Sequence, residues 1–471
     1  MRLEQFVLES LGHASYLVGS ENTGEALVLD PRRDVDIYFE AAWRRGFHIR
    51  YAIDTHGHND YLSGLTELAA RDKDVRLLGS AAGELGYEHR AVKDGEVVEM
   101  GEVAFEVLHT PGHTPEHVSL LVREDGHDDP ALMLSGGALL VGDVARPDLL
   151  GGSEQTRDMA RALCRTIQEK VLTLPDHVEV FPTHVAGSLC GGNIGSRLST
   201  TVGYERRTNE LLAQVSSGDV FVQECLSLES LPAVPPYWRR MRTQNLAGVE
   251  RLGTLQEPPG FRPDAFRSAI DDGAVVLDAR SPEAFGGGHI PRSLNVELGG
   301  SFPTWAGTVL PDGARVLLVL DDPGDLWPAT WELLRIGYSV PEGWLAGGMR
   351  AWATGGGGLE RTQGITAEEL HDRLGGVTVL DVRQPGEWAD GHIEGATFIT
   401  AGELPDHLDD VPQDDPLAVI CGSGLRSSVA ASLLARERDR HPLHVLGGMA
   451  AWRAAGYPTV PGDALEGRVR P

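Results

Sequence analysis

Basic residues are scarce in this chain of 471 residues, with 41 Lys and Arg against 69 Asp and Glu, a formal net charge of −28. So acidic a chain is expected to bind neither nucleic acid nor an anionic membrane surface. Long hydrophobic runs are also missing, because runs such as residues 316–320 fall far short of the ~20 residues that span a bilayer. The first residues lack the basic and apolar segments of a signal peptide. These absences predict a soluble, cytoplasmic protein.

Cysteine is rare as well, and its scarcity excludes a disulfide framework. The length favours two to four domains, and the 58 glycines indicate many tight turns. The four cysteines are Cys164, Cys190, Cys225 and Cys421.

The C-terminal half contains an internal repeat. The stretch that begins at Val275 aligns with the one that begins at Thr378, so that Asp278 pairs with Asp381 at an offset of 103. Residues 345–352 pair with residues 446–452, where Trp352 and Trp452 differ by 100. Units of about 100 residues are separate domains rather than solenoid repeats. Within each unit, apolar runs alternate with helical stretches, which predicts a small α/β domain with a parallel sheet.

Segments rich in proline or glycine at residues 255–263 and 354–364 are typical of linkers. They divide the chain into three predicted domains, residues 1–250, 262–356 and 364–465.

Histidines and carboxylates gather at four places in the first domain, each expected after a strand-like run. Residues 49–54 predict a buried strand, and a helix is expected from about Tyr61. Because imidazole and carboxylate groups both donate lone pairs, such clusters at one sheet edge indicate a metal site. The four clusters are residues 55–60 (THGHND), 109–117 (HTPGHTPEH), 142–144 (GDV, after the apolar run 138–141) and 181–184 (FPTH).

These motifs resemble the metallo-β-lactamase superfamily, and its glyoxalase II-like branch in particular. The resemblance implies an αββα sandwich. The superfamily's first motif is T-H-x-H-x-D-H, and this chain has Tyr61 at the last position. In di-metal hydrolases of the superfamily that histidine is a ligand of the second metal. A tyrosine, with an ordinary pKa near ~10, replaces it poorly, so the second site is expected to be weak or empty.

One metal bound by two histidines and one carboxylate is the arrangement of non-heme Fe(II) oxygenases. The chain resembles the persulfide dioxygenase branch over about residues 5–240, including segments 143–149 and 184–191. That resemblance implies one Fe(II) per chain, with His56, His113 and Asp143 as its ligands. His58, Asp60 and His184 are then expected to orient the ligands or bound water, or to form a second site.

Two residues near this site keep two interpretations each. Arg146 is a candidate for binding the substrate, or it pairs with Asp148. Cys190 either relays sulfur or, as we favour, is a small buried packing residue.

A strand-like run at residues 417–420 leads into Cys421, small residues and a helical run at residues 429–438. The unpaired N–H groups of a helix start, together with Arg426, favour the thiolate form of such a cysteine. This segment resembles the rhodanese active loop, C-x-x-G-x-R, which implies that Cys421 carries sulfane sulfur and that Arg426 stabilises the sulfur oxyanion. The loop residues expected to cradle that anion are Gly422, Ser423, Gly424 and Leu425.

The middle unit shares the motifs LDAR, GHI and GGMRAW but has Asp321 where an offset of 100 from Cys421 places the nucleophile. A carboxylate cannot carry persulfide sulfur. We therefore expect a catalytically silent rhodanese-like domain, a spacer or an assembly surface.

Together the modules indicate Fe(II)-dependent oxidation of a small thiol persulfide by O₂ to sulfite and thiol, coupled to sulfur transfer at Cys421 that forms or uses thiosulfate. One alternative is a glyoxalase II-like thioester hydrolase with zinc; another is a sulfur carrier or sensor. The identity of the thiol and the oligomeric state, a homo-oligomer included, remain open.

Overall fold

The computed structural model describes residues 1–226 and 231–462, and these residues form two compact units. The first unit comprises residues 1–226 and 238–253, and the second comprises residues 231–237 and 254–462. The predicted domain ends at residues 250, 262, 356 and 364 stay predictions, and residues 463–465 of the predicted third domain lie outside the described residues.

The first unit contains two six-stranded sheets. In the first sheet, β1 to β3 are antiparallel and β3 to β6 are parallel; in the second, only the pair β10–β11 is parallel. The strands of the first sheet are β1 (Arg2–Leu8), β2 (His13–Gly19), β3 (Glu25–Leu29), β4 (His48–Ile53), β5 (Arg76–Ser80) and β6 (Arg90–Val92). Those of the second are β7 (Val97–Met100), β8 (Val103–His109), β9 (Val118–Glu124), β10 (Leu132–Gly136), β11 (Glu179–Pro182) and β12 (Thr200–Thr201).

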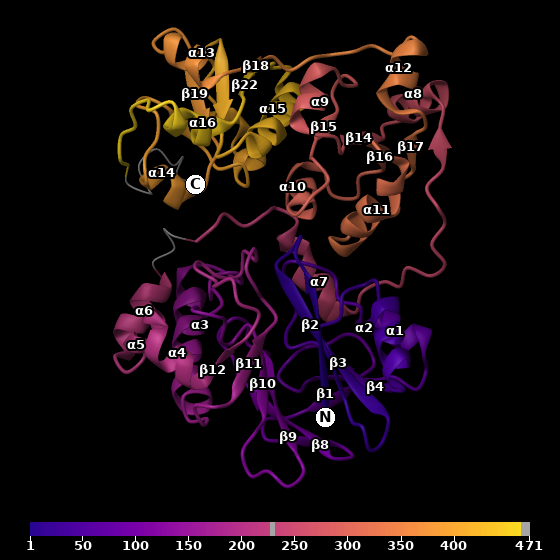
Figure 1. The fold of residues 1–471 in the computed structure, drawn as a ribbon, viewed down its shortest axis with the longest axis vertical. Coiled ribbons are helices and arrows are strands. Elements are labelled where there is room, and N and C mark those ends of the chain that lie inside the picture. Colours follow the sequence, from indigo (N-terminus) through magenta and orange to yellow (C-terminus); the bar gives the residue numbers. More distant parts are fainter. Residues whose placement is uncertain (227–230, 463–471) are drawn as a thin grey trace. The chain divides into compact units, whose positions relative to one another are not determined.

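Helices cover the outer face of each sheet, so the layers run α, β, β, α (Figure 1). The core between the sheets includes Tyr16, Phe105 and Leu134, all fully buried. This arrangement confirms the αββα sandwich that the sequence motifs imply. The helical segments are α1 (Asp36–Arg45), α2 (Leu65–Arg71), α3 (Ser153–Thr166), η1 (Ile167–Val171), α4 (Val202–Thr208), α5 (Glu210–Gln214), α6 (Gly218–Leu226) and α7 (Trp238–Ala247).

The second unit contains two five-stranded parallel sheets with the same strand order. The first is ordered β13 (Gly260–Phe261), β17 (Gly343–Leu345), β16 (Val316–Val319), β14 (Val275–Asp278), β15 (Leu294–Asn295). The second is ordered β18 (Gly364–Ile365), β22 (Leu443–Val445), β21 (Leu417–Ile420), β19 (Thr378–Asp381), β20 (Thr397–Phe398). The shared order confirms that the repeat encodes two α/β domains with parallel sheets.

Helices pack against each of these two sheets. Around the first sheet lie α8 (Pro263–Asp271), α9 (Pro282–Gly287), α10 (Phe302–Val309), η3 (Pro323–Asp325), α11 (Leu326–Arg335) and α12 (Gly348–Thr354). Around the second lie α13 (Ala367–Asp372), α14 (Pro385–Ala389), η4 (Leu404–Asp406), η5 (Leu408–Asp410), α15 (Leu425–Arg438) and α16 (Gly448–Ala454).

Two local predictions are wrong. The run 138–141, expected to be strand-like, is an irregular bend after β10, and the helix expected from about Tyr61 begins at Leu65.

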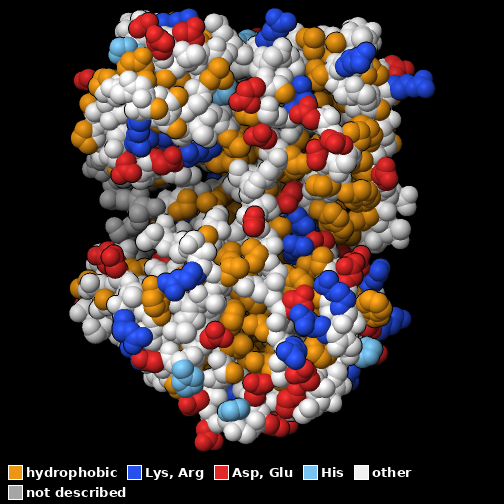
Figure 2. Space-filling view, viewed as in Figure 1, with side chains coloured by type: hydrophobic (Ala, Val, Ile, Leu, Met, Phe, Trp, Pro, Cys, Tyr) orange, Lys and Arg blue, Asp and Glu red, His pale blue; other side chains and the backbone are white. Residues whose placement is uncertain are grey.

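The surface carries charged side chains of both signs. On the face drawn in Figure 2, acidic and basic side chains are interspersed rather than separated into one charged surface. Among residues 1–226 and 231–462, none of the helices combines the length and apolar character that crossing a bilayer takes.

Candidate active sites

Three histidines from distant parts of the first unit converge at one edge of the sandwich. His56 follows β4, His113 lies between β8 and β9, and His184 follows β11. One ligating atom from each lies within 4.8 Å of the other two, and all three side chains are at most 2% exposed. Among the described residues, the Nε2 atoms of these histidines have no hydrogen-bond partner. Buried polar atoms without partners are rare, so this arrangement is suited to a metal ion.

The other nitrogen of each ring sets the tautomer. Nδ1 of His113 donates to the backbone carbonyl of Arg146 at 2.8 Å. Nδ1 of His56 lies 2.8 Å from Oγ1 of Thr55, whose own proton goes to the Asp30 carboxylate, so His56 donates here. Nδ1 of His184 lies 3.5 Å from Oδ2 of Asp60. With the proton on Nδ1, each Nε2 presents a lone pair to the shared space.

Two of the three imidazoles are held neutral. Burial and the neighbouring His58 keep the pKa of His56 well below its ordinary value. Burial, with His184 nearby, does the same to the pKa of His113. Neutral imidazole is the form that binds metal ions.

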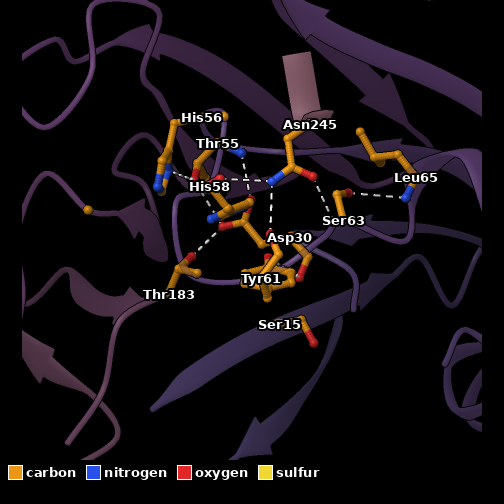
Figure 3. Close-up of polar contacts among 12 residues, drawn as sticks. Ser15, Asp30, Thr55, His56, His58, Tyr61, Ser63, Leu65, Thr183 and Asn245 are labelled. Carbon is orange, nitrogen blue, oxygen red and sulfur yellow. Dashed lines mark hydrogen bonds and ion pairs between the residues drawn. The ribbon is translucent and has the colours of Figure 1, made fainter. Parts of the chain in front are cut away.

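Asp30, directly after β3, organises the first histidine motif (Figure 3). Its carboxylate accepts hydrogen bonds from the backbone N–H of Thr55 (2.6 Å), from Oγ1 of Thr55 (2.9 Å), from Nε2 of His58 (3.1 Å) and from Oγ1 of Thr183. Although burial opposes it, Asp30 raises the pKa of His58 to about 9. Asp30 adopts a left-handed φ of 52°, which Asp tolerates better than most residues. The sequence analysis missed Asp30; its position after the apolar run 26–29 was the available signal.

Tyr61 does not face the three imidazoles with its hydroxyl. The hydroxyl donates to the backbone carbonyl of Asp30 at 3.2 Å, and the ring lies 4.6 Å from that of His58 and 4.1 Å from that of His13. Burial, with Asp30 nearby, raises the pKa of Tyr61 well above its ordinary value. The phenol therefore stays protonated and is a poor metal ligand.

Asp143 is not among the three residues that converge. Its Oδ2 accepts the N–H groups of Gly192 and Asn193, each at 2.8 Å, and its Oδ1 accepts the N–H of Val144 at 2.8 Å. Burial raises its pKa. The assignment of Asp143 as an iron ligand thus stays a prediction. His184, expected only to support the ligands or a second site, lies with His56 and His113 and also in a group with Asp60 and Cys190.

Arg146 pairs with Asp148 through two bonds of 2.7 Å from Nε and Nη2, the arrangement that one of its two interpretations predicts. Because the guanidinium is occupied by this carboxylate, the main contact of Arg146 with the histidine cluster is its backbone carbonyl on His113.

Helix α7 reaches back to the first histidine motif. Nδ2 of Asn245 donates to the carbonyls of His58 and Tyr61, each at 2.8 Å, and its Oδ1 accepts the N–H of Ser63 at 2.9 Å (Figure 3). On the same helix, Arg242 binds Glu116 through two bonds of 2.6 and 2.8 Å. The sequence gives no signal for these contacts, because more than 100 residues separate the partners.

Residues 421–424 connect β21 to α15, which begins at Leu425, four residues before the helical run expected from residue 429. The Cys421 side chain is 1% exposed, its Sγ accepts the N–H of Gly424 at 3.1 Å, and Oγ of Ser427 lies 3.4 Å away. The carbonyl of Cys421 accepts the N–H of Met449 in α16. Gly424 adopts a φ of 121°, which favours glycine and lets its N–H face the sulfur.

Arg426 forms an ion pair that the sequence analysis missed. Its Nη1 and Nη2 bind the two oxygens of Glu387 at 2.6 and 2.8 Å. Glu387 opposes the effect of burial and raises the pKa of Arg426, and Arg426 in turn lowers that of Glu387. The guanidinium is thus fixed beside the loop. His444 also contacts this loop, with its Nε2 2.8 Å from the carbonyl oxygen of Gly424.

In the middle domain, Asp321 follows β16 and is exposed. The next residue, Asp322, accepts the N–H of Gly324 at 2.8 Å and caps the start of η3. Position 321 therefore holds an exposed aspartate in place of the nucleophilic cysteine.

Comparison with known families agrees with this geometry. Residues 9–184 match the metallo-beta-lactamase superfamily, and residues 262–354 and 366–455 match the rhodanese-like domain. The chain is therefore a metallo-β-lactamase-fold domain followed by two rhodanese-like domains.

Among the relatives of the first domain, persulfide dioxygenase ETHE1 of Bos taurus mitochondria is 29% identical over 180 residues, 36% of this chain and 63% of that protein. A hydroxyacylglutathione hydrolase of Polaromonas sp. is 31% identical over 172 residues, 36% of this chain and 61% of that protein. The chain thus spans less than two thirds of the length of these curated relatives. A crystal structure described as a metallo-beta-lactamase from Staphylococcus aureus is 29% identical, with a TM-score of 0.66, and covers 73% of this chain and 98% of that one.

Proposed function

We propose that the first domain oxidises a low-molecular-weight thiol persulfide with O₂, using one Fe(II) ion per chain. The balanced reaction is RSSH + O₂ + H₂O → RSH + SO₃²⁻ + 2 H⁺. Relatives named persulfide dioxygenase support this choice, as does the domain's fusion to rhodanese-like domains.

The convergence of three buried Nε2 atoms carries the metal part of the proposal. Bound Fe(II) would supply open positions for persulfide sulfur and O₂. His56 and His113 are held neutral and oriented by Thr55 and Arg146, so their lone pairs are ready to bind. The Tyr61 hydroxyl donates to the carbonyl of Asp30 and is not turned toward a metal ion, which favours a single ion over a dinuclear centre. For the third protein ligand, the family resemblance favours Asp143, whereas the distances favour His184.

We propose that the third domain transfers sulfane sulfur through a persulfide on Cys421. In one direction, sulfite takes the outer sulfur: Cys421–S–S⁻ + SO₃²⁻ → Cys421–S⁻ + S₂O₃²⁻. The N–H of Gly424 stabilises negative charge on sulfur, and Arg426 offers a positive charge at the loop. Sulfite made by the first domain is a substrate for this step, which would make the chain suited to sulfide detoxification.

A zinc-dependent thioester hydrolase is the alternative, because a hydroxyacylglutathione hydrolase is also among the relatives. Elemental analysis of protein purified without O₂ tests the choice. We expect one Fe per chain and O₂ uptake in step with added glutathione or coenzyme A persulfide. Two Zn per chain with thioester hydrolysis would establish the hydrolase, and persulfide binding without O₂ uptake would establish a carrier or sensor.

Alanine variants of the candidate ligands test the metal site. We expect His113→Ala to lose iron and O₂ uptake, because His113 is a ligand whether the third ligand is Asp143 or His184. Iron retained in Asp143→Ala but lost in His184→Ala would make His184 the third ligand, and the reverse would make it Asp143. His109→Ala is the matched control, since His109 binds the carbonyl of Pro115. A full iron content in His113→Ala would refute the site.

A further inference from the structure

Helix α15, which begins at the Cys421 loop, is buried on two sides. It packs on β21 and β22 of its own sheet and also against β15 and α10 of the middle domain (Figure 1). Residues 427–434 are all buried, including the hydroxyl-bearing Ser428 and Ser432. A helix that is buried around its whole circumference must satisfy its polar side chains internally. Its contacts with the middle domain therefore decide where those hydroxyls bind.

One residue of the middle domain meets both serines. Oγ of Ser428 donates to Oδ1 of Asn295 at 2.5 Å, and the backbone N–H of Asn295 donates to Oγ of Ser432 at 2.9 Å. All three residues are at most 3% exposed. Because buried hydrogen bonds of this kind are costly to leave unmade, they fix the position of α15 relative to β15.

The side-chain amide of Asn295 is also fixed by hydrogen bonds within the middle domain. Its Nδ2 donates to the carbonyls of Asp278 and Arg280 at 3.1 and 3.0 Å. Asp278 and Arg280 form a buried ion pair, and Arg280 also donates to the carbonyl of Gly288. These are the LDAR and GHI segments that the middle domain keeps although it lacks a nucleophile. They fix the backbone to which the Asn295 amide is bound.

The two repeats differ at this position. Asn295 pairs with Asp278 in β14–β15, and Phe398 pairs with Asp381 in the equivalent β19–β20. Phe398 is a core residue that stacks on Trp388 at 4.8 Å. A buried amide in place of this aromatic ring is explained by its contacts with the two serines of α15.

We propose that the silent middle domain positions the catalytic loop of the third domain, and that Asn295 is the positioning residue. Ser428 lies two residues after Arg426 in the first turn of α15, and its N–H donates to the carbonyl of Gly424. Holding Ser428 therefore holds the turn that presents Arg426 and the Gly424 N–H to Cys421. The role of the loop in sulfur transfer rests on the proposed function, but its geometry can be tested without it.

Alkylation of Cys421 by iodoacetamide, measured against pH in the full chain, reports the state of the loop directly. All four cysteines are buried, so a Cys421→Ser chain supplies the background reaction of the other three. We expect Asn295→Ala and Ser428→Ala each to move the midpoint of the rate profile to higher pH and to slow thiosulfate-dependent sulfur transfer about threefold or more. We expect the double variant to be no worse than either single one. O₂ uptake should stay unchanged.

Arg436→Gln is the matched control. Arg436 lies near the other end of α15 and donates to the middle domain's Arg292 carbonyl at 2.9 Å, so its loss weakens the same interface far from the loop. We expect a lower melting temperature without a change in the alkylation profile. Ser428→Ala leaves β15 intact and serves if Asn295→Ala fails to fold. Folded Asn295→Ala and Ser428→Ala chains with wild-type alkylation profiles would overturn the proposal, whereas a wild type without sulfur transfer would refute only the function.

Discussion

At the scale of single residues, the two candidate sites control charge in different ways. In the first site, burial lowers the pKa of His56 and His113 and leaves them as neutral ligands. Around Cys421, the charge of Arg426 is balanced by Glu387, whose side chain is 39% exposed. An ion pair so close to solvent stabilises the fold only modestly. Its main effect is to fix the guanidinium next to the loop.

We predict that Glu387→Gln lowers the free energy of unfolding at pH 7 by about 1 kcal/mol or less. The folded protein lowers the pKa of Glu387, so its contribution is present above the unfolded-state value near ~4.3 and is lost as the pH falls. The difference between wild type and variant should therefore shrink towards pH 3–4 (about one unit below that value). Urea unfolding followed at several pH values measures it. The exposed Glu394, changed to Gln, is the control, and an equal pH dependence in both variants would contradict the prediction.

At the scale of elements, α7 shows how a distant helix shapes the metal site. The helix expected from about Tyr61 begins only at Leu65, because Asn245 binds the backbone of residues 58, 61 and 63 and keeps this segment out of a helix. The local sequence could not reveal this, since the amide that satisfies those backbone groups lies more than 180 residues away.

We predict that Asn245→Ala destabilises the first unit by about 2–4 kcal/mol, because it leaves two buried carbonyls and one buried N–H without their partner. The urea concentration at which bound metal is released reports on this unit alone. Gln244→Ala changes the exposed neighbour on the same helix and should have little effect. Equal metal release in the two variants would show that Asn245 does not stabilise the motif.

At the scale of the whole molecule, the two activities are expected to be separable, because each candidate site is complete within its own unit. We predict that Cys421→Ser abolishes sulfur transfer from thiosulfate but leaves O₂ uptake with a small persulfide. An oxygen electrode and a thiosulfate-dependent sulfurtransferase assay measure the two rates. The complementary variant His113→Ala should keep sulfur transfer. Parallel loss of both activities in either variant would contradict independent sites.

Asp321→Ala tests whether the middle domain is silent. Because Asp321 is exposed and occupies the position of the missing nucleophile, we predict a stability change within about 0.5 kcal/mol and both activities unchanged. A marked fall in sulfur transfer would show that this loop takes part in the reaction. The prediction is compatible with a positioning role for Asn295, which lies on β15 rather than on the Asp321 loop.

The sequence by itself determined the chemistry that is available. The histidine motifs, the Cys421 loop, the repeat and the absence of a cysteine at position 321 all depend on residues close together or at a fixed offset. The alternation of apolar and helical runs also predicted the parallel sheets of the repeat, because strand and helix formation follows nearby residues, whereas the sandwich was implied by the family resemblance of the motifs.

Only the tertiary structure decided which side chains meet. It placed His184 with His56 and His113, paired Arg426 with Glu387, and brought Asn245 and Asn295 to partners more than 130 residues away. Hydrogen bonds and ion pairs of this kind depend on how separate elements pack. The sequence between two such partners shows no periodic pattern from which their contact could be predicted.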